Sequence, residues 1–157
     1  MIRHERLIAV ISSGDIRLGR GSGFALVVTD GRIVGTSRLE SLGIPEPYLW
    51  VEGGSSETGR AAAQVEAARL IGRKKFELSK ESIFKILYEA PGLFFGGRLI
   101  FESVGEEVRL DISVVSVRNP SGVLTVEKMI DALLIFAPDR LYDEKSGALV
   151  RDENPRR

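Results

Sequence analysis

The sequence predicts an α+β fold with mainly antiparallel strands, in which a partly open barrel is closed by a C-terminal amphipathic helix and interrupted by a helical insertion. Two observations concern the strands: short runs of β-forming residues are separated by glycine- and proline-rich turns, and an Asp-Gly pair lies between two such runs. The third is that apolar residues recur at helical spacing near the end of the chain. A curled sheet has to bury its open side, and such a helix can cover it.

The N-terminal part predicts one strand followed by a tight hairpin. Residues 7–11 form a continuous apolar run that ends at polar residues and a glycine, which is typical of a short buried strand. After a glycine-rich turn at residues 19–23, two β-rich runs flank Asp30 and Gly31. An Asp-Gly pair tolerates the positive φ angles of a type I′ turn, so we predict a hairpin over residues 23–37.

Residues 39–75 form the predicted insertion, a loop followed by a helix. Prolines, glycines and the only Trp of the chain lie in residues 39–56, which predicts an irregular segment. Residues 58–71 are rich in Ala, the residue with the highest helix propensity. Ser56 or Thr58 can cap the start of this helix, and Gly72 suits the position just after its end.

A second β region and a closing helix complete the predicted domain, residues 1–138. Strands are predicted at the apolar or alternating runs 83–88, 98–102 and 108–114. Two Phe residues, 94 and 95, lie in the loop between the first two of these, where they would either plug the core, as we expect, or form an exposed adhesive edge. Apolar residues from Val126 to Ala137 recur at helical spacing, and Pro138 ends the helix. Residues 139–157 carry many charges of both signs and few anchors, which predicts a flexible tail.

The hairpin sequence resembles the pleckstrin-homology-like superfamily, in particular GRAM-type and bacterial PH-like domains. Residues 27–35, Val-Val-Thr-Asp-Gly-Arg-Ile-Val-Gly, match a pattern common in the second hairpin of those domains, and residues 76–83 match a strand that follows it. Residues 99–117 are similar to the next strand pair and 123–137 to the closing helix. The resemblance covers residues 5–137 and implies a PH-like partly open barrel that binds lipid headgroups or peptides beside its first loops. The helical insertion departs from that pattern, and a different small α+β barrel or sandwich is the competing fold.

Composition excludes several classes of function. Lys plus Arg equals Asp plus Glu, at 22 each, whereas nucleic-acid binders carry a basic excess, so we expect no nucleic-acid partner. The chain lacks Cys and therefore thiolate chemistry and sulfur-ligated metals. No apolar run is long enough for a transmembrane segment, and the N-terminus lacks the features of a signal peptide, so we expect a cytoplasmic protein. Arg far outnumbers Lys, and Asn and Gln are scarce, which hints at a thermostable protein.

Few residues are suited to catalysis, and we expect no catalytic residue, metal site or cofactor. His4 is the only His, which excludes most His-based relays and two-His metal sites. The glycine-rich segment 19–23 leads into a strand, whereas phosphate-binding glycine loops lead into a helix. No group of carboxylates has the spacing of metal ligands.

Binding residues are easier to nominate. The basic side chains could form an anion-attracting face, and by resemblance Arg17 and Arg20 occupy a ligand-binding loop; the competing interpretation is solvated surface charge. Tyr48 and Trp50 lie among prolines and could contact a partner, or Trp50 could fold back over the sheet as a lid. The candidate ligand-binding residues are Arg17, Arg20, Arg32, Arg73, Lys74, Lys75, Tyr48 and Trp50.

These features predict a non-catalytic binding module. Its ligand would be a protein segment, a second copy of the chain, or an anionic lipid headgroup. The alternative is a small-ligand-binding protein or an enzyme with a pocket under the loop at residues 39–56. A structural subunit that assembles through strand edges or the Ala-rich helix is a third hypothesis.

Overall fold

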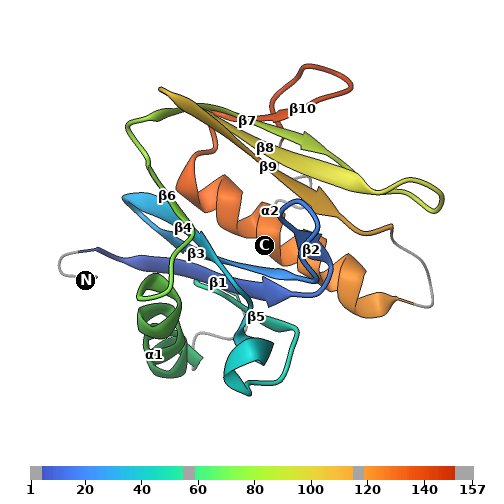
Figure 1. The fold of residues 1–157 in the computed structure, drawn as a ribbon. Coiled ribbons are helices and arrows are strands. Elements are labelled where there is room, and N and C mark those ends of the chain that lie inside the picture. The colour runs from blue at the N-terminus through green and yellow to red at the C-terminus, as the bar shows by residue number, and fades with distance from the viewer. Residues whose placement is uncertain (1–4, 55–58, 115–118, 151–157) are drawn as a thin grey trace.

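Two five-stranded sheets and two α-helices make up the fold (Figure 1). The structure is a computed structural model that describes residues 5–54, 59–114 and 119–150. The first sheet has the strand order β5 (Tyr48–Val51), β1 (Leu7–Ser13), β3 (Phe24–Thr29), β4 (Arg32–Thr36) and β6 (Phe76–Ser79). The second has the order β10 (Leu141–Asp143), β7 (Ile83–Glu89), β8 (Gly97–Ser103), β9 (Glu106–Ile112) and β2 (Ile16–Arg17).

The strands are mainly antiparallel, as predicted. The hairpin predicted at residues 23–37 is confirmed, because β3 and β4 pair antiparallel from Ala25 opposite Thr36 to Val28 opposite Ile33. The pairing of β10 with β7 is parallel. The sheets do not close into a barrel. The chain passes from the first sheet to the second at the β1–β2 turn, returns between β2 and β3, and crosses again from β6 to β7.

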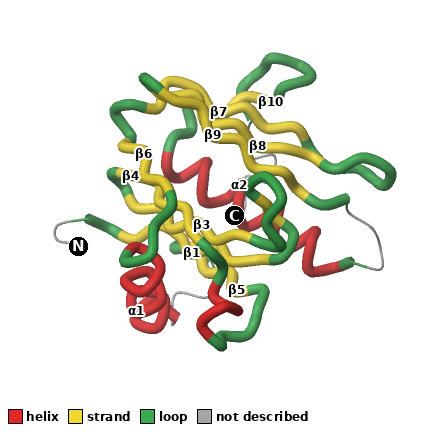
Figure 2. Tube along the Cα trace, viewed as in Figure 1, coloured by secondary structure: helices red, strands yellow, loops and turns green. Residues whose placement is uncertain are grey.

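Helix α2 (Pro120–Phe136) lies between the two sheets, as Figures 1 and 2 show. Its buried residues include Met129 and Leu133, which share one core with residues of both sheets. The predicted packing of this segment against the strands is therefore confirmed. The helix fills the space between two sheets, whereas the sequence predicted that it would close one end of a curled sheet.

Helix α1 (Arg60–Ile71) covers the other face of the first sheet (Figure 1). It buries Ala63, Ala67 and Leu70, which lie on one side of the helix and form a second core with Val10 and Val27 of the sheet. The first sheet is thus covered on both faces, which explains why β1 and β3 are apolar without alternation. The proposed caps Ser56 and Thr58 lie outside the described residues.

Three segments differ from the predictions. The predicted loop at residues 39–56 contains a 3-10 helix (Leu39–Leu42) and strand β5, which pairs with β1. The predicted tail contains strand β10, anchored by the buried Leu141. Phe94 and Phe95 are 86% and 80% exposed in the β7–β8 loop, so the prediction that they plug the core is wrong. Among the described residues, neither helix is long and apolar enough to cross a membrane.

Candidate binding groove

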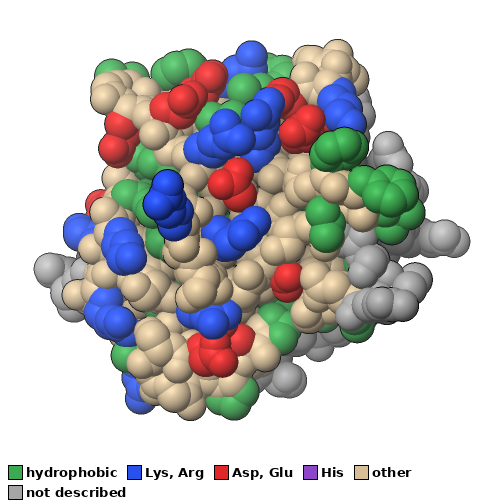
Figure 3. Space-filling view, turned by 45° about the vertical axis from the view of Figure 1, so that its right-hand side comes forward, with side chains coloured by type: hydrophobic (Ala, Val, Ile, Leu, Met, Phe, Trp, Pro, Cys, Tyr) green, Lys and Arg blue, Asp and Glu red, His purple; other side chains and the backbone are tan. Residues whose placement is uncertain are grey.

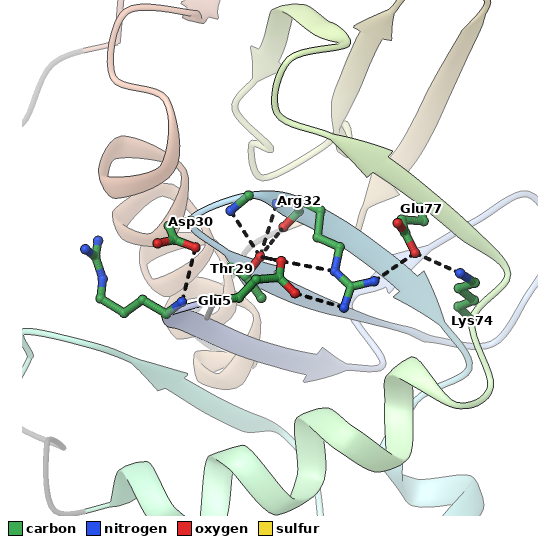
Figure 4. Close-up of polar contacts among 8 residues, drawn as sticks. Glu5, Thr29, Asp30, Arg32, Lys74 and Glu77 are labelled. Carbon is green, nitrogen blue, oxygen red and sulfur yellow. Dashed lines mark hydrogen bonds and ion pairs between the residues drawn. The ribbon is translucent and has the colours of Figure 1, made fainter. Parts of the chain in front are cut away.

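The predicted residue Arg32 is held in a charge network on the β3–β4 hairpin (Figure 4). Its guanidinium lies 3.0 Å from the Glu5 carboxylate and 2.9 Å from that of Glu77. Lys74 contacts the same Glu77 oxygen at 2.8 Å, and the Thr29 hydroxyl donates to Glu5 at 2.7 Å. Two of the predicted cations therefore neutralise carboxylates of the same chain.

The pKa shifts in this network follow from those contacts. Burial by itself lowers the pKa of Arg32, but its hydrogen bonds and charge interactions with Glu5 and Glu77 outweigh burial and raise it. The hydrogen bond from Lys74 lowers the pKa of Glu77, and Arg32 lowers it further against the opposing effect of burial. These contacts stabilise the charged forms of Arg32 and Glu77, and the ion pair between the two side chains links β4 to β6.

The remaining predicted cations are spread over several elements. Arg17 lies in β2 of the second sheet opposite Asp111, and Arg20 lies in the exposed loop that follows. Arg20 precedes the six-residue strand β3 and Arg32 follows it, so the two are separated by roughly 20 Å of extended chain. The exposed Arg73 and Lys75 flank Lys74 between α1 and β6. On the face of the molecule that Figure 3 shows, Lys and Arg side chains are interspersed with Asp and Glu.

The two predicted aromatic residues pack toward α1. Trp50 is 3% exposed and belongs to the core between the first sheet and α1, with the Arg60 guanidinium 4.9 Å from its ring centroid. Tyr48 is half-buried against the same core. Burial raises the pKa of the Tyr48 hydroxyl, and the nearby charge of Glu66 adds to the effect. Trp50 is therefore a core residue of a strand within the first sheet, which neither of the two roles considered for it describes.

A groove of about 960 Å³ runs along the side of α2 that the sheets leave uncovered. Its floor is formed by one stripe of the helix and a residue two positions after its end, namely Leu124, Glu127, Lys128, Asp131, Leu134, Ile135 and Pro138. One wall is the end of β5 and the following turn, at residues 51–54, and the other is formed by Leu149 and Val150. We refer to this feature as the α2 groove.

The α2 groove is elongated and its lining is mixed, with apolar side chains beside the charged Glu52, Glu127, Lys128 and Asp131. Leu124 and Ile135 are 11 positions apart, which corresponds to roughly 16 Å along the helix and to about five residues of an extended chain. Their side chains are 44% and 38% exposed. Glu52 on the wall forms ion pairs of 2.9 Å with Arg6 and with Arg60, so its charge is compensated within the chain. The groove can accept an apolar chain beside a few polar side chains.

Sequence reasoning missed this groove, although a signal for it was present. Of the predicted amphipathic stripe, only Leu134 lines the groove, yet Val123, Leu124 and Ile135 make α2 apolar on further sides. A helix that is apolar around most of its circumference has to be covered on most sides. In this structure the two sheets cover two sides of α2, and the α2 groove runs along a side that they leave open.

A polar cluster fixes the start of α2. The Asn119 side chain accepts a hydrogen bond from the Gly122 amide at 3.2 Å and donates one to Asp15 at 2.9 Å. The Thr125 hydroxyl lies 3.1 Å from that of Ser13, which in turn lies 3.2 Å from the Asp15 carboxylate. The cluster ties the β1–β2 turn to the first turns of the helix, so it positions the floor of the α2 groove.

No group of three or more His, Cys, Asp or Glu within the described ranges is arranged to hold a metal ion. His4 lies outside those ranges. A scan against models of protein families found no match, and searches of curated proteins and of solved structures found none either.

Proposed function

We propose that this protein is a non-catalytic binding module that takes an extended, apolar protein segment into the α2 groove. The observation that carries the proposal is that apolar side chains of α2 lie at both ends of the groove floor, Leu124 at one end and Ile135 at the other, between walls that are partly apolar. Charged side chains of the helix lie between these two ends. A groove that accommodates about five extended residues fits a chain segment better than a compact molecule. Residues 51–54, at the end of the edge strand β5, line one side of the groove.

A small apolar ligand is the second candidate. The volume of about 960 Å³ lies within the range of small-molecule sites, roughly 300–1,000 Å³. This candidate matches the pocket expected under the loop at residues 39–56, because Val51 to Gly54 form a wall of the groove.

The PH-like identity and the binding of an anionic headgroup are retained as subordinate proposals. The Thr29-Asp30-Gly31-Arg32 turn and the closing helix support the first. The exposed Arg17 and Arg20 support the second. The compensation of Arg32 by two carboxylates weakens the headgroup proposal, since an anion would compete with both.

The experiment compares two fluorescent probes by titration. One is a labelled pentapeptide with Leu, Phe and Leu between two Lys, and the other is the dye 1-anilinonaphthalene-8-sulfonate. The groove variant Leu124→Asp/Ile135→Asp should weaken peptide binding at least about tenfold, equivalent to about 1.4 kcal/mol. The control Val65→Asp changes an apolar residue of α1 that is 53% exposed, and it should bind as the unmodified protein does.

Three results are informative. Peptide binding that the groove variant loses and the control keeps supports the segment-binding function. Binding of the dye alone with the same dependence replaces it with the small-ligand candidate. Absence of binding by either probe, or equal binding by the groove variant, rejects the α2 groove as a binding site.

A further inference from the structure

The loop between β7 and β8 carries three consecutive large apolar side chains that face solvent. Leu93, Phe94 and Phe95 are 67%, 86% and 80% exposed, and we call them the apolar tip. Figure 1 shows the loop extending past the end of the second sheet, and Figure 3 shows hydrophobic side chains gathered at that edge. Soluble proteins leave single apolar side chains exposed, but a contiguous group marks an interaction site.

The apolar tip stands on a well-defined base. The Gly92 amide donates to the Phe95 carbonyl at 2.8 Å, which closes a tight turn. A Cβ atom on Gly96 would lie 2.5 Å from the Ile112 carbonyl oxygen, so the loop returns to the sheet directly against β9. A loop that is ordered before binding loses less conformational entropy when it docks.

Charge around the apolar tip is compensated, which argues against an electrostatic partner. Residues 90–97 contain no charged side chain. Arg98, the first charge after them, forms ion pairs with Glu144 and, at 3.5 Å, with Glu89. An anionic membrane or a nucleic acid would be attracted by uncompensated cations, so the contact expected here is apolar.

We infer that the apolar tip of one copy of this chain inserts into the α2 groove of a second copy. This inference rests on the proposed function, since the groove is the acceptor. The tip presents three apolar side chains on a short loop, and the groove presents the uncovered apolar side chains of α2, among them Leu124 and Ile135. Within one chain the tip is exposed, so its own groove does not cover it.

The expected association is weak. A buried aromatic side chain covers about 150–250 Å², so one tip together with the groove surface that covers it reaches about 1,000 Å². That area lies at the low end of specific interfaces, which implies a complex that forms only at high protein concentration. Because the three side chains of the tip are apolar, raised salt should not dissociate the complex.

Complementation between two variants tests the inference by analytical ultracentrifugation. The tip variant Phe94→Asp/Phe95→Asp keeps the groove, and the groove variant Leu124→Asp/Ile135→Asp keeps the tip. We expect each alone to remain monomeric at concentrations at which the unmodified protein associates. An equimolar mixture should form a complex of one copy of each. The control Val104→Asp alters an apolar residue of the β8–β9 turn that is 76% exposed, and it should associate normally. Circular dichroism checks that every variant is folded.

Several results would overturn the inference. They are an unmodified protein that stays monomeric, a tip variant that still associates, or a mixture of the two variants that does not. Flotation of the monomer with neutral phosphatidylcholine vesicles, lost only in the tip variant, would assign the tip to a bilayer instead. The tip variant also separates this inference from the proposed function. If it binds the labelled pentapeptide while the unmodified protein never self-associates, the groove is a binding site and its partner is not the tip.

Discussion

Replacing Gly35 by Ala should destabilise the protein although it adds one methyl group to a strand. Gly35 lies in β4 directly opposite Phe76 of β6, whose ring stacks on that of Phe24 with centroids 5.8 Å apart. A Cβ atom on Gly35 would lie 2.7 Å from the Phe24 ring and still closer to the Phe76 ring. Both rings therefore occupy the space that the missing side chain leaves.

The magnitude follows from which ring can move. Phe24 is 2% exposed and fixed by the core, so the half-buried Phe76 has to give way. Overpacking costs about 1–3 kcal/mol, and loss of the ring stacking costs about 0.5–1.5 kcal/mol. We expect a decrease of about 2 kcal/mol in the free energy of unfolding, which corresponds to about 4–8 °C in melting temperature for a domain of this size.

A second glycine provides the control for this measurement. Gly72 follows α1 with φ −63° and ψ −16°, and a Cβ there would approach no atom closer than 3.6 Å. The same substitution at Gly72 should stabilise the protein by about 0.4–1 kcal/mol, because it restricts only the unfolded chain. Thermal and urea unfolding of both variants measure the two signs. The steric reasoning would be refuted if the Gly35→Ala protein were as stable as the unmodified one. It would also be refuted if Gly35→Ala were as destabilising in a Phe76→Ala background as in the unmodified protein.

Three further predictions concern α2 and the second sheet. Asn119→Ala removes the cap that accepts from Gly122 and should cost about 1–2 kcal/mol in urea unfolding; an unchanged midpoint would contradict a capping role. Met129→Ala should cost about 2–5 kcal/mol, because the side chain is 1% exposed between the sheets; a loss below 1 kcal/mol would mean that the site is not packed. Burial, aided by the charge of Asp143, raises the pKa of Tyr88 to about 12. The neutral Tyr88 side chain therefore contributes its full stabilisation below pH 10, and this contribution is lost as pH rises toward 12. Ultraviolet titration should show one phenol with a high pKa in the unmodified protein that is missing from Tyr88→Phe.

Elements whose structure is decided locally could be predicted from the sequence. The conformation of the Asp30-Gly31 turn is determined by these two residues, and the β-rich runs on either side of the turn pair with each other. The Ala-rich run became α1 without needing a strong apolar stripe, because small side chains let it approach the first sheet closely. Both segments that were predicted to be helical are α-helices, because residue propensity and spacing within each segment determine this.

Elements that depend on distant partners could not be predicted. Strand β5 reads as a proline-rich loop, and it becomes a strand because β1, nearly forty residues earlier, offers it a free edge. Strand β10 has three residues, and its place beside β7 depends on burying Leu141. No local sequence pattern indicates that a strand pairs with a partner so far away in the chain.

The start of α2 shows how one short sequence supports two interpretations. Asn119 and Pro120 are both common in turns, so the sequence alone is also typical of a turn after the last strand. The same two residues are an N-cap and a first helical residue, so α2 begins six residues before Val126, where the predicted apolar spacing starts. What decides between the interpretations is Asp15, which binds Asn119 from more than a hundred residues away.

The candidate site follows from a mismatch between α2 and what covers it. A helix between two sheets needs apolar side chains on two sides, and Met129 and Leu133 belong to that requirement. Leu124 and Ile135 do not, because they are partly exposed along the α2 groove. The core therefore gives no reason for their apolarity, whereas a segment that binds in the groove does. The apolar tip poses the same question on another surface, and a contact between the two surfaces would answer both.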